Sequence, residues 1–174
     1  QRVTEVGGMF EKFINWLENI FSVSHEPSFE IVDNMDIFVK DKLNSMLDGA
    51  KSFDIATGYF QISGWKTFAD SVNAIVKNGM KVRLLIGNTS RECLLPQTAK
   101  FLLNLIKNPQ IEARTIKPRF LHAKVFIAKT EDKLRLLFGS SNITFGGTEA
   151  NIELNVYEIL DFESKKAQDF VEWY

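Results

Sequence analysis

The chain has 174 residues, which suits one domain with a sizeable core, and its 45% hydrophobic and 25% charged residues are ordinary for a globular protein. A single cysteine, Cys93, excludes an internal disulfide framework and a cysteine-based zinc site, and favours a reducing, cytoplasmic setting. The net charge of -1 gives no overall attraction to nucleic acid, and charges interrupt every apolar run before it could span a membrane.

Apolar side chains at helical spacing predict a first helix over residues 9–21, which we expect to pack on the domain or on a partner chain. His25 follows in a predicted loop and has the sequence context of a solvated residue. A short strand over 29–32 and a helix over 36–47 come next. Because the chain opens on Gln1 and stops within a predicted helix, we expect it to be a piece of a longer protein.

From residue 52 onward, predicted strands and helices alternate, and a turn over 130–133 joins two strands as a hairpin. Ser63 is expected to cap one helix, and Gly79 to end it. This order predicts an α/β sandwich with a largely buried sheet. The predicted strands are 52–60, 81–87, 111–116, 121–129, 133–139 and 152–160, and the predicted helices are 63–79, 95–108 and 162–173.

The hairpin carries the second histidine, two residues before a lysine. Residues two apart on a strand point to the same side, so His122 and Lys124 should share a face. If the turn centres on Asp132 with an odd number of loop residues, Lys124 lies opposite Ser140 and His122 lies opposite Asn142. The same register matches the apolar positions of the two strands, pairing Phe126 with Phe138 and Ala128 with Leu136.

This predicted cluster has the chemistry of a phosphate site. Lysine, serine and asparagine are hydrogen-bond donors, and donors without a carboxylate among them suit an anionic oxygen cluster. A histidine with an ordinary pKa of about 6.5 can attack phosphorus or donate a proton near neutral pH. Glu153, on the next predicted strand, is expected to orient the His122 ring.

Together these residues resemble a known signature, the H-x-K…G-S-x-N motif of the phospholipase D superfamily of phosphodiesterases. "HAK" occupies 122–124 and "GSSN" occupies 139–142, and "NIE" at 151–153 matches the N-x-E of its nuclease-like branch. "FDIATGYFQISGWKTFADSV" and "KVRLLIG" are similar to the first strand-helix-strand unit of that fold, so the resemblance covers about residues 50 to 172. "DIATGYF" is also similar to the phospholipase-D-like module of some bacterial helicase-like and restriction-related ATPases.

The resemblance implies a phospholipase D-like α-β-α sandwich with a mixed sheet over residues 50–174, preceded by an N-terminal helical extension over 1–49. It implies phosphodiester cleavage without a metal or other cofactor, through a covalent phosphohistidine. In that mechanism the nucleophile is His122 and the carboxylate that holds its ring is Glu153. The phosphate oxygens would be held by Lys124, Ser140 and Asn142.

The implied mechanism uses two histidines, whereas this chain has one complete motif and His25 lacks the H-x-K context. We therefore expect a symmetric homodimer with two His122 rings facing each other across a two-fold axis. The fuller family motif has an aspartate where this chain has Lys129. That departure weakens a lipid phosphodiesterase more than a nuclease.

We expect a nuclease that acts on nucleic acid, DNA rather than RNA, as part of a larger helicase-like or restriction-related protein, with no membrane partner. Two alternatives stay open: a catalytically inactive DNA-binding or dimerisation module that keeps the fold, and a phospholipase. Seven Lys/Arg against three Asp/Glu between residues 112 and 135 predict a local basic surface. The expected substrate-binding residues are Tyr59, Lys117, Arg119, Lys129 and Lys133; Phe60 could stack on bases beside Tyr59, although strand aromatics more often belong to the core.

Overall fold

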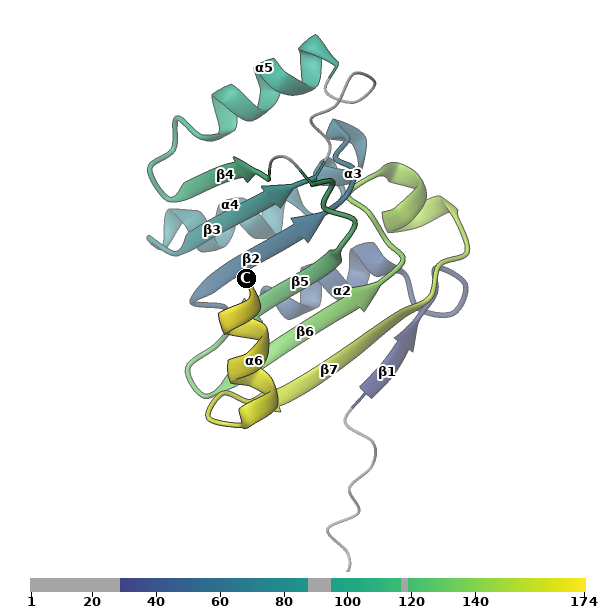
Figure 1. Cartoon of the computed structure of the whole chain (residues 1–174), viewed down its shortest axis with the longest axis vertical. Helices are drawn as coiled ribbons and strands as arrows, with labels where there is room; N and C mark the ends of the chain where they lie inside the picture. The colour runs from purple at the N-terminus through teal and green to yellow at the C-terminus, as the bar shows by residue number, and fades with distance from the viewer. Residues whose placement is uncertain (1–28, 88–94, 117–118) are drawn as a thin grey trace, which may run out of the picture.

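One mixed sheet of seven strands organises the protein, whose structure, a computed structural model, describes residues 29–87, 95–116 and 119–174. The strand order is β1-β7-β6-β5-β2-β3-β4 (Figure 1). Parallel pairing joins β2 to β3 and β3 to β4, and the remaining neighbours are antiparallel. The strands are β1 (Phe29–Val32), β2 (Ser52–Thr57), β3 (Lys81–Ile86), β4 (Ile111–Thr115), β5 (Lys124–Lys129), β6 (Lys133–Gly139) and β7 (Asn155–Asp161).

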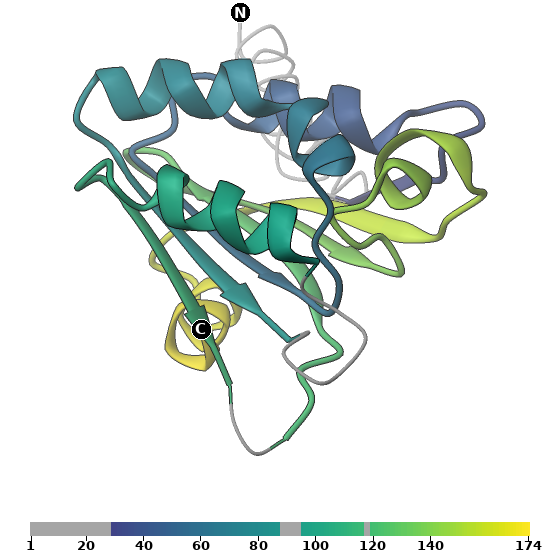
Figure 2. The ribbon, with the colours of Figure 1, turned by 90° about the horizontal axis from the view of Figure 1, so that it is seen from above.

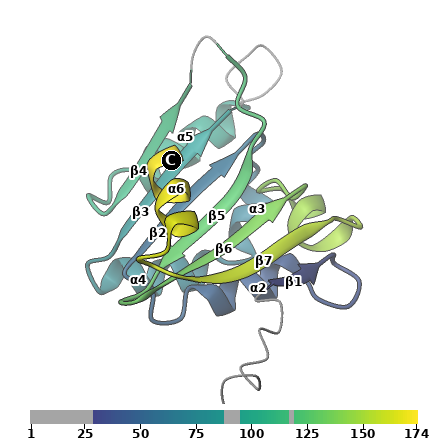
Figure 3. The ribbon, with the colours of Figure 1, turned by 60° about the horizontal axis from the view of Figure 1, so that its bottom comes forward.

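Helices cover both faces of this sheet, which confirms the predicted α-β-α sandwich with a mixed sheet. Among the described residues, four α-helices lie on one face, and α6 lies across the other (Figures 2 and 3). A π-helix, η1 (Gly146–Ala150), follows the "GSSN" segment. The α-helices are α2 (Val39–Met46), α3 (Ile62–Lys66), α4 (Ala69–Lys77), α5 (Pro96–Leu105) and α6 (Lys165–Trp173).

Two apolar clusters fill the spaces between these layers. The larger one joins sheet residues such as Phe53 and Phe126 to all four helices of the first face. The smaller one packs Ile127 and Leu136 under Ala167 of α6. Apolar side chains therefore occupy both sides of β5 and β6, which explains their nearly continuous hydrophobic sequence.

The predicted helix over 63–79 is two helices, α3 and α4, with a break at Thr67 and Phe68. The Thr67 hydroxyl donates to the Gly64 carbonyl at 2.8 Å, so the side chain competes with the backbone for that acceptor. Ser63 does not cap the helix, because α3 begins one residue earlier and Gln61 is its N-cap residue. Gly79 does end α4, with a φ of 79° that favours glycine.

The expected domain boundary at residue 50 is wrong for the described residues that precede it. The predicted strand over 29–32 is β1, and it pairs with β7 in the same sheet. The predicted helix over 36–47 is α2, and Leu43 and Met46 are part of the larger core cluster. The predicted helix over 9–21 and His25 lie outside the described residues.

The hairpin forms as predicted, but its register differs by one residue. Phe126 pairs with Leu137, and Ala128 pairs with Arg135, because the turn contains two residues, Glu131 and Asp132. The expected pairs assumed that one face of the hairpin was core and the other was not. Since both faces are covered, either register buries apolar side chains, and the hydrophobic pattern does not separate them.

Candidate active site

The residues of the motif converge at the end of the sheet where β2 and β6 finish and β5 and β7 begin (Figure 1). There Thr57 pairs with Lys124, and Gly139 pairs with Asn155. His122 lies two residues before β5, so it belongs to the segment leading into the strand and not, as predicted, to the strand itself. Ser140 directly follows β6.

The first functional contact joins His122 to Lys124. The lysine Nζ lies 2.9 Å from the imidazole Nε2 and also donates to the His122 carbonyl oxygen at 2.8 Å. An ammonium group has donors but no acceptor, so Nε2 is the acceptor, and the ring proton of a neutral imidazole then sits on Nδ1. This tautomer leaves a lone pair on Nε2, the atom at which the ring could attack phosphorus.

Lys124 is buried although its side chain carries the charge of the site. Burial lowers its pKa from the ordinary value because a charged ammonium is poorly solvated there, whereas the charge of Glu153 acts in the opposite direction. A cation held in such surroundings interacts strongly with an incoming anion, since little water screens it.

Glu153 contacts Ser140 and not the His122 ring that we predicted it would hold. The Ser140 hydroxyl donates to its carboxylate and accepts from the backbone N–H of Leu154 at 2.9 Å. The backbone of Glu153 is itself fixed, because its N–H donates to the Asp33 carbonyl at 2.9 Å. The carboxylate therefore orients the serine and acts on Lys124 through its charge.

Asn142 is fixed by the end of β2. Its Oδ1 accepts from the Tyr59 N–H at 3.0 Å, and the Thr57 hydroxyl lies 3.5 Å away. That hydroxyl also donates to the Tyr59 carbonyl at 2.8 Å and accepts from the Ile143 N–H at 3.1 Å. Because Oδ1 accepts from the Tyr59 N–H, the asparagine presents its NH₂ group as the donor for a ligand.

Two glycines let the His122 segment approach the strand ends closely. A Cβ at Gly58 would lie 3.2 Å from Asn142 Oδ1 and 3.6 Å from His122 Cα, so this glycine sits between two residues of the motif. A Cβ at Gly87, which follows β3, would lie 2.0 Å from the Leu121 carbonyl oxygen. A side chain at either position would push His122 away from Asn142.

A buried asparagine, Asn155, fixes the serine-asparagine loop from the other side. Its Oδ1 accepts from the Ser141 N–H at 3.1 Å, and its Nδ2 donates to the Ser141 hydroxyl at 2.9 Å and to the Val32 carbonyl at 3.0 Å. These three hydrogen bonds satisfy the amide group of Asn155, although the residue is almost fully buried.

Aromatic rings extend the site beyond the predicted residues. The Tyr59 ring lies 5.7 Å from Phe120, which lies 5.8 Å from the His122 ring. Both Tyr59 and Phe120 are a little under half exposed, whereas Phe60 is buried and packs against Trp65 in the core. The sequence analysis did not identify Phe120; its place two residues before the histidine is the signal that could have found it.

The predicted basic residues fall in different places. Arg119 is exposed next to Phe120, and Lys117 lies outside the described residues. Lys129 lies at the opposite end of β5 from Lys124, with its Nζ 3.6 Å from the centre of the Phe162 ring. Lys133 is also at that end and forms an ion pair with Asp161. These two lysines are therefore not part of this site, contrary to our prediction.

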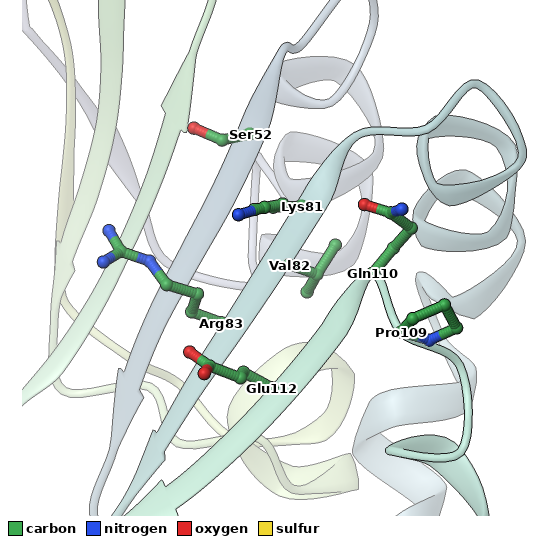
Figure 4. A pocket seen from close by; sticks show the side chains of 7 residues that line it. All are labelled: Ser52, Lys81, Val82, Arg83, Pro109, Gln110 and Glu112. Atoms are coloured by element: carbon green, nitrogen blue, oxygen red, sulfur yellow. The ribbon is translucent and has the colours of Figure 1, made fainter.

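A cavity of about 400 Å³ lies at the same far end, on the sheet face that carries Arg83 and Glu112 (Figure 4). Ser52 lines it, and Ser52 pairs with Lys129, five residues along β5 from Lys124. Its Arg83 is already paired with Asp54, and its Glu112 with Arg114. It contains no histidine, so it is separate from the candidate active site.

Residues 43–171 match the family described as "Cardiolipin synthase, PLD-like domain", and the chain therefore belongs to this family of the phospholipase D superfamily. The resemblance drawn from the motif is thus confirmed. A curated relative, the NRPS-independent siderophore synthetase of Rhizopus delemar, is 30% identical over 106 residues. The match takes in 60% of this chain but only 16% of that protein's length.

Solved structures show the same fold. NucT from Helicobacter pylori has a TM-score of 0.64 and 18% identity, over 84% of this chain and 92% of that one. Nuc from Salmonella typhimurium, a phospholipase D family member, has a TM-score of 0.64 and 23% identity, over 85% and 91%. The archaeal chromatin protein TrmBL2, which binds DNA, has a TM-score of 0.51 and 18% identity, over 99% and 62%.

Within the described part of the chain, none of the helices has the length and apolar character needed to cross a bilayer.

Proposed function

We propose that the protein is a phosphodiesterase that cleaves nucleic acid without a metal ion, with His122 as the nucleophile. One observation carries this proposal: the His122 Nε2 accepts from a buried ammonium group at the end of the sheet where Ser140 and Asn142 also lie. A nucleophile, a cation and a neutral donor, here the NH₂ group of Asn142, are what attack on a phosphodiester requires; the Ser140 hydroxyl already donates to Glu153.

The reaction begins when the Lys124 ammonium group forms a hydrogen bond to a substrate phosphate oxygen in place of its hydrogen bond to His122. This exchange frees the Nε2 lone pair. Nε2 then forms a bond to phosphorus, and the bond from phosphorus to the leaving oxygen breaks. A proton donor protonates the leaving oxygen, and water later gives a proton back to that group as it attacks phosphorus. The P–N bond then breaks, and its electron pair returns to Nε2. Lys124 and the Asn142 NH₂ group offset the charge on the phosphate oxygens throughout.

The proton donor of this mechanism is a second histidine, the His122 of another copy of this chain. Among the described residues His122 is the one histidine, and its ring is exposed at the end of the sheet, where another copy can reach it. Ile152 and Leu154 flank Glu153 in the sequence and are 75% and 65% exposed, which supports a subunit contact beside the site.

Nucleic acid is the substrate that the neighbours Nuc and NucT and the exposed Arg119 support. From the "DIATGYF" resemblance we further infer that the domain acts as the nuclease module of a helicase-like or restriction-related protein. The DNA-binding neighbour TrmBL2 supports a second candidate, a module of this fold that binds DNA without cleaving it.

Hydrolysis of bis-(p-nitrophenyl) phosphate and of DNA, both in EDTA, tests the proposal. We expect turnover in the wild-type chain and a loss of about a thousandfold or more in His122→Ala, because the covalent step is removed. His25→Ala is the matched control and should keep full activity. Turnover that survives in His122→Ala would exclude this mechanism, and DNA binding without turnover in the wild-type chain would favour the second candidate.

A further inference from the structure

We propose that Tyr59 and Phe120 form a stacking platform for an unpaired base next to the scissile phosphate, so that the site takes single-stranded nucleic acid. The inference rests on the proposed function, since it names the substrate class of the same site.

The platform is a row of rings that leads away from the nucleophile. Phe120 stands in the middle, with ring centres 5.8 Å from His122 and 5.7 Å from Tyr59. The Tyr59 and Phe120 rings meet at 55°, so they are not stacked face to face. Tyr59 is 42% exposed and Phe120 is 46% exposed, and neither belongs to the apolar clusters of the core.

Both rings are attached to the catalytic groups through the backbone. The Tyr59 N–H donates to Asn142 Oδ1. The backbone that carries the Tyr59 ring therefore also holds the asparagine whose NH₂ group would bind the phosphate. Phe120 precedes the nucleophile by two residues, in a segment packed closely against Gly58 and Gly87. A phosphate held at His122 would therefore carry its neighbouring base toward a fixed aromatic surface.

Stacking on such a surface requires a base with a free face. In a duplex both faces of a base are covered by its neighbours, and the phosphates lie outside the stack. In a single strand the bases can turn toward the protein, and base-aromatic stacking contributes binding that does not depend on sequence. The platform therefore selects for strandedness and not for a particular base.

Binding measured in EDTA by fluorescence anisotropy tests this inference, using the full chain with His122→Asn so that the oligonucleotide stays intact. The probes are a short labelled single-stranded DNA, the same strand with abasic sites, and the duplex. We expect Phe120→Ala to weaken binding of the base-bearing single strand about tenfold, and binding of the abasic strand and the duplex by no more than about twofold. Phe120→Trp should retain tight binding, whereas Phe120→Leu, which keeps an apolar side chain, should behave like alanine.

Equal losses on the base-bearing and abasic strands, or no loss on either, would overturn the inference. A change from dimer to monomer in Phe120→Ala, seen by sedimentation, would overturn it as well and would identify the ring row as a subunit contact. Failure of the proposed function would be seen in a different experiment. Hydrolysis that persists in His122→Ala would exclude the proposed mechanism but would not affect the stacking result, because stacking is measured as binding to a variant that lacks the nucleophile.

Discussion

At the residue scale, the contact between Lys124 and His122 occupies the Nε2 lone pair in the free protein. In the proposed mechanism, a phosphate that attracts the ammonium group would expose that lone pair. Binding of the anion and exposure of the proposed nucleophile would then be one event, and the imidazole would be protected while the site is empty.

Glu153 should control the pH range over which this exchange works. Phosphate binding needs a protonated Lys124, and activity therefore falls as pH rises through the pKa of this lysine, which burial holds below its ordinary value. The Glu153 charge raises that pKa, so Glu153→Gln should lower it further. We expect the alkaline limb of the kcat/KM profile to move to lower pH in the variant.

Glu131→Gln provides the matched control, because Glu131 is exposed in the hairpin turn at the far end of β5. It should leave the profile in place. An alkaline limb that stays where it is, or moves to higher pH, in Glu153→Gln would show that the carboxylate does not act on Lys124.

At the element scale, β2 and the segment after β6 are joined by Thr57, whose hydroxyl is fully buried. Thr57→Val keeps the shape of the side chain but leaves the Ile143 N–H without its acceptor. A buried donor left in this way costs about 1–3 kcal/mol of unfolding free energy. We expect that loss in urea unfolding, together with a drop in kcat, since Asn142 is adjacent to the released backbone.

Thr57→Ser restores the hydroxyl and should recover most of the stability and the activity, although it removes a buried methyl group. If the valine variant unfolds at the same urea concentration as the wild type, the hydroxyl does not fix the loop. If Thr57→Ser loses as much activity as Thr57→Val, the hydrogen bond does not control activity, because the serine variant still has the hydroxyl that accepts from the Ile143 N–H.

Elements with strong periodicity could be predicted from the sequence, and so could the order of strands and helices after residue 52. The hairpin register and the break at Thr67 could not. The register depends on whether the turn has two residues or three, and two apolar faces hide the difference. The break depends on a side chain that competes with the backbone, which periodicity does not record.

In the candidate site, too, some features could be predicted from the sequence and others could not. His122, Lys124, Ser140 and Asn142 could be predicted because they form a short motif with fixed spacing. Thr57 and Tyr59 reach Asn142 across more than 80 residues of sequence, so their roles follow from the pairing of β2 with β5 and not from a local pattern. The partner of Glu153 was missed for a related reason: spacing predicts proximity but not which donor a carboxylate takes.

At the scale of the whole molecule, the proposed mechanism needs a second copy of the chain to complete the site. Leu154→Lys should disrupt the proposed contact between copies, because it places a charge on an exposed apolar side chain beside Glu153. We expect a shift from dimer to monomer in sedimentation equilibrium and a loss of about a hundredfold in turnover. The unfolding free energy of the monomer should change by no more than about 0.5 kcal/mol.

Leu103→Lys is the control, since Leu103 is similarly exposed but lies on α5. This variant should leave both the mass of the assembly in sedimentation equilibrium and the turnover rate unchanged. A Leu154→Lys protein that stays dimeric, or a monomer that turns over at the wild-type rate, would contradict a site shared between two copies.

The edge strand β1 connects the reactive end of the sheet to the sequence upstream of it. Asn155 holds the Val32 carbonyl, and the Glu153 N–H holds the Asp33 carbonyl, so the N-x-E segment rests on a strand that precedes the residues matched by the family. Separation of β1 from β7 would break both attachments at once. It would also free the backbone of Glu153, the partner of Ser140, so the geometry of the proposed active site depends on this edge strand staying paired.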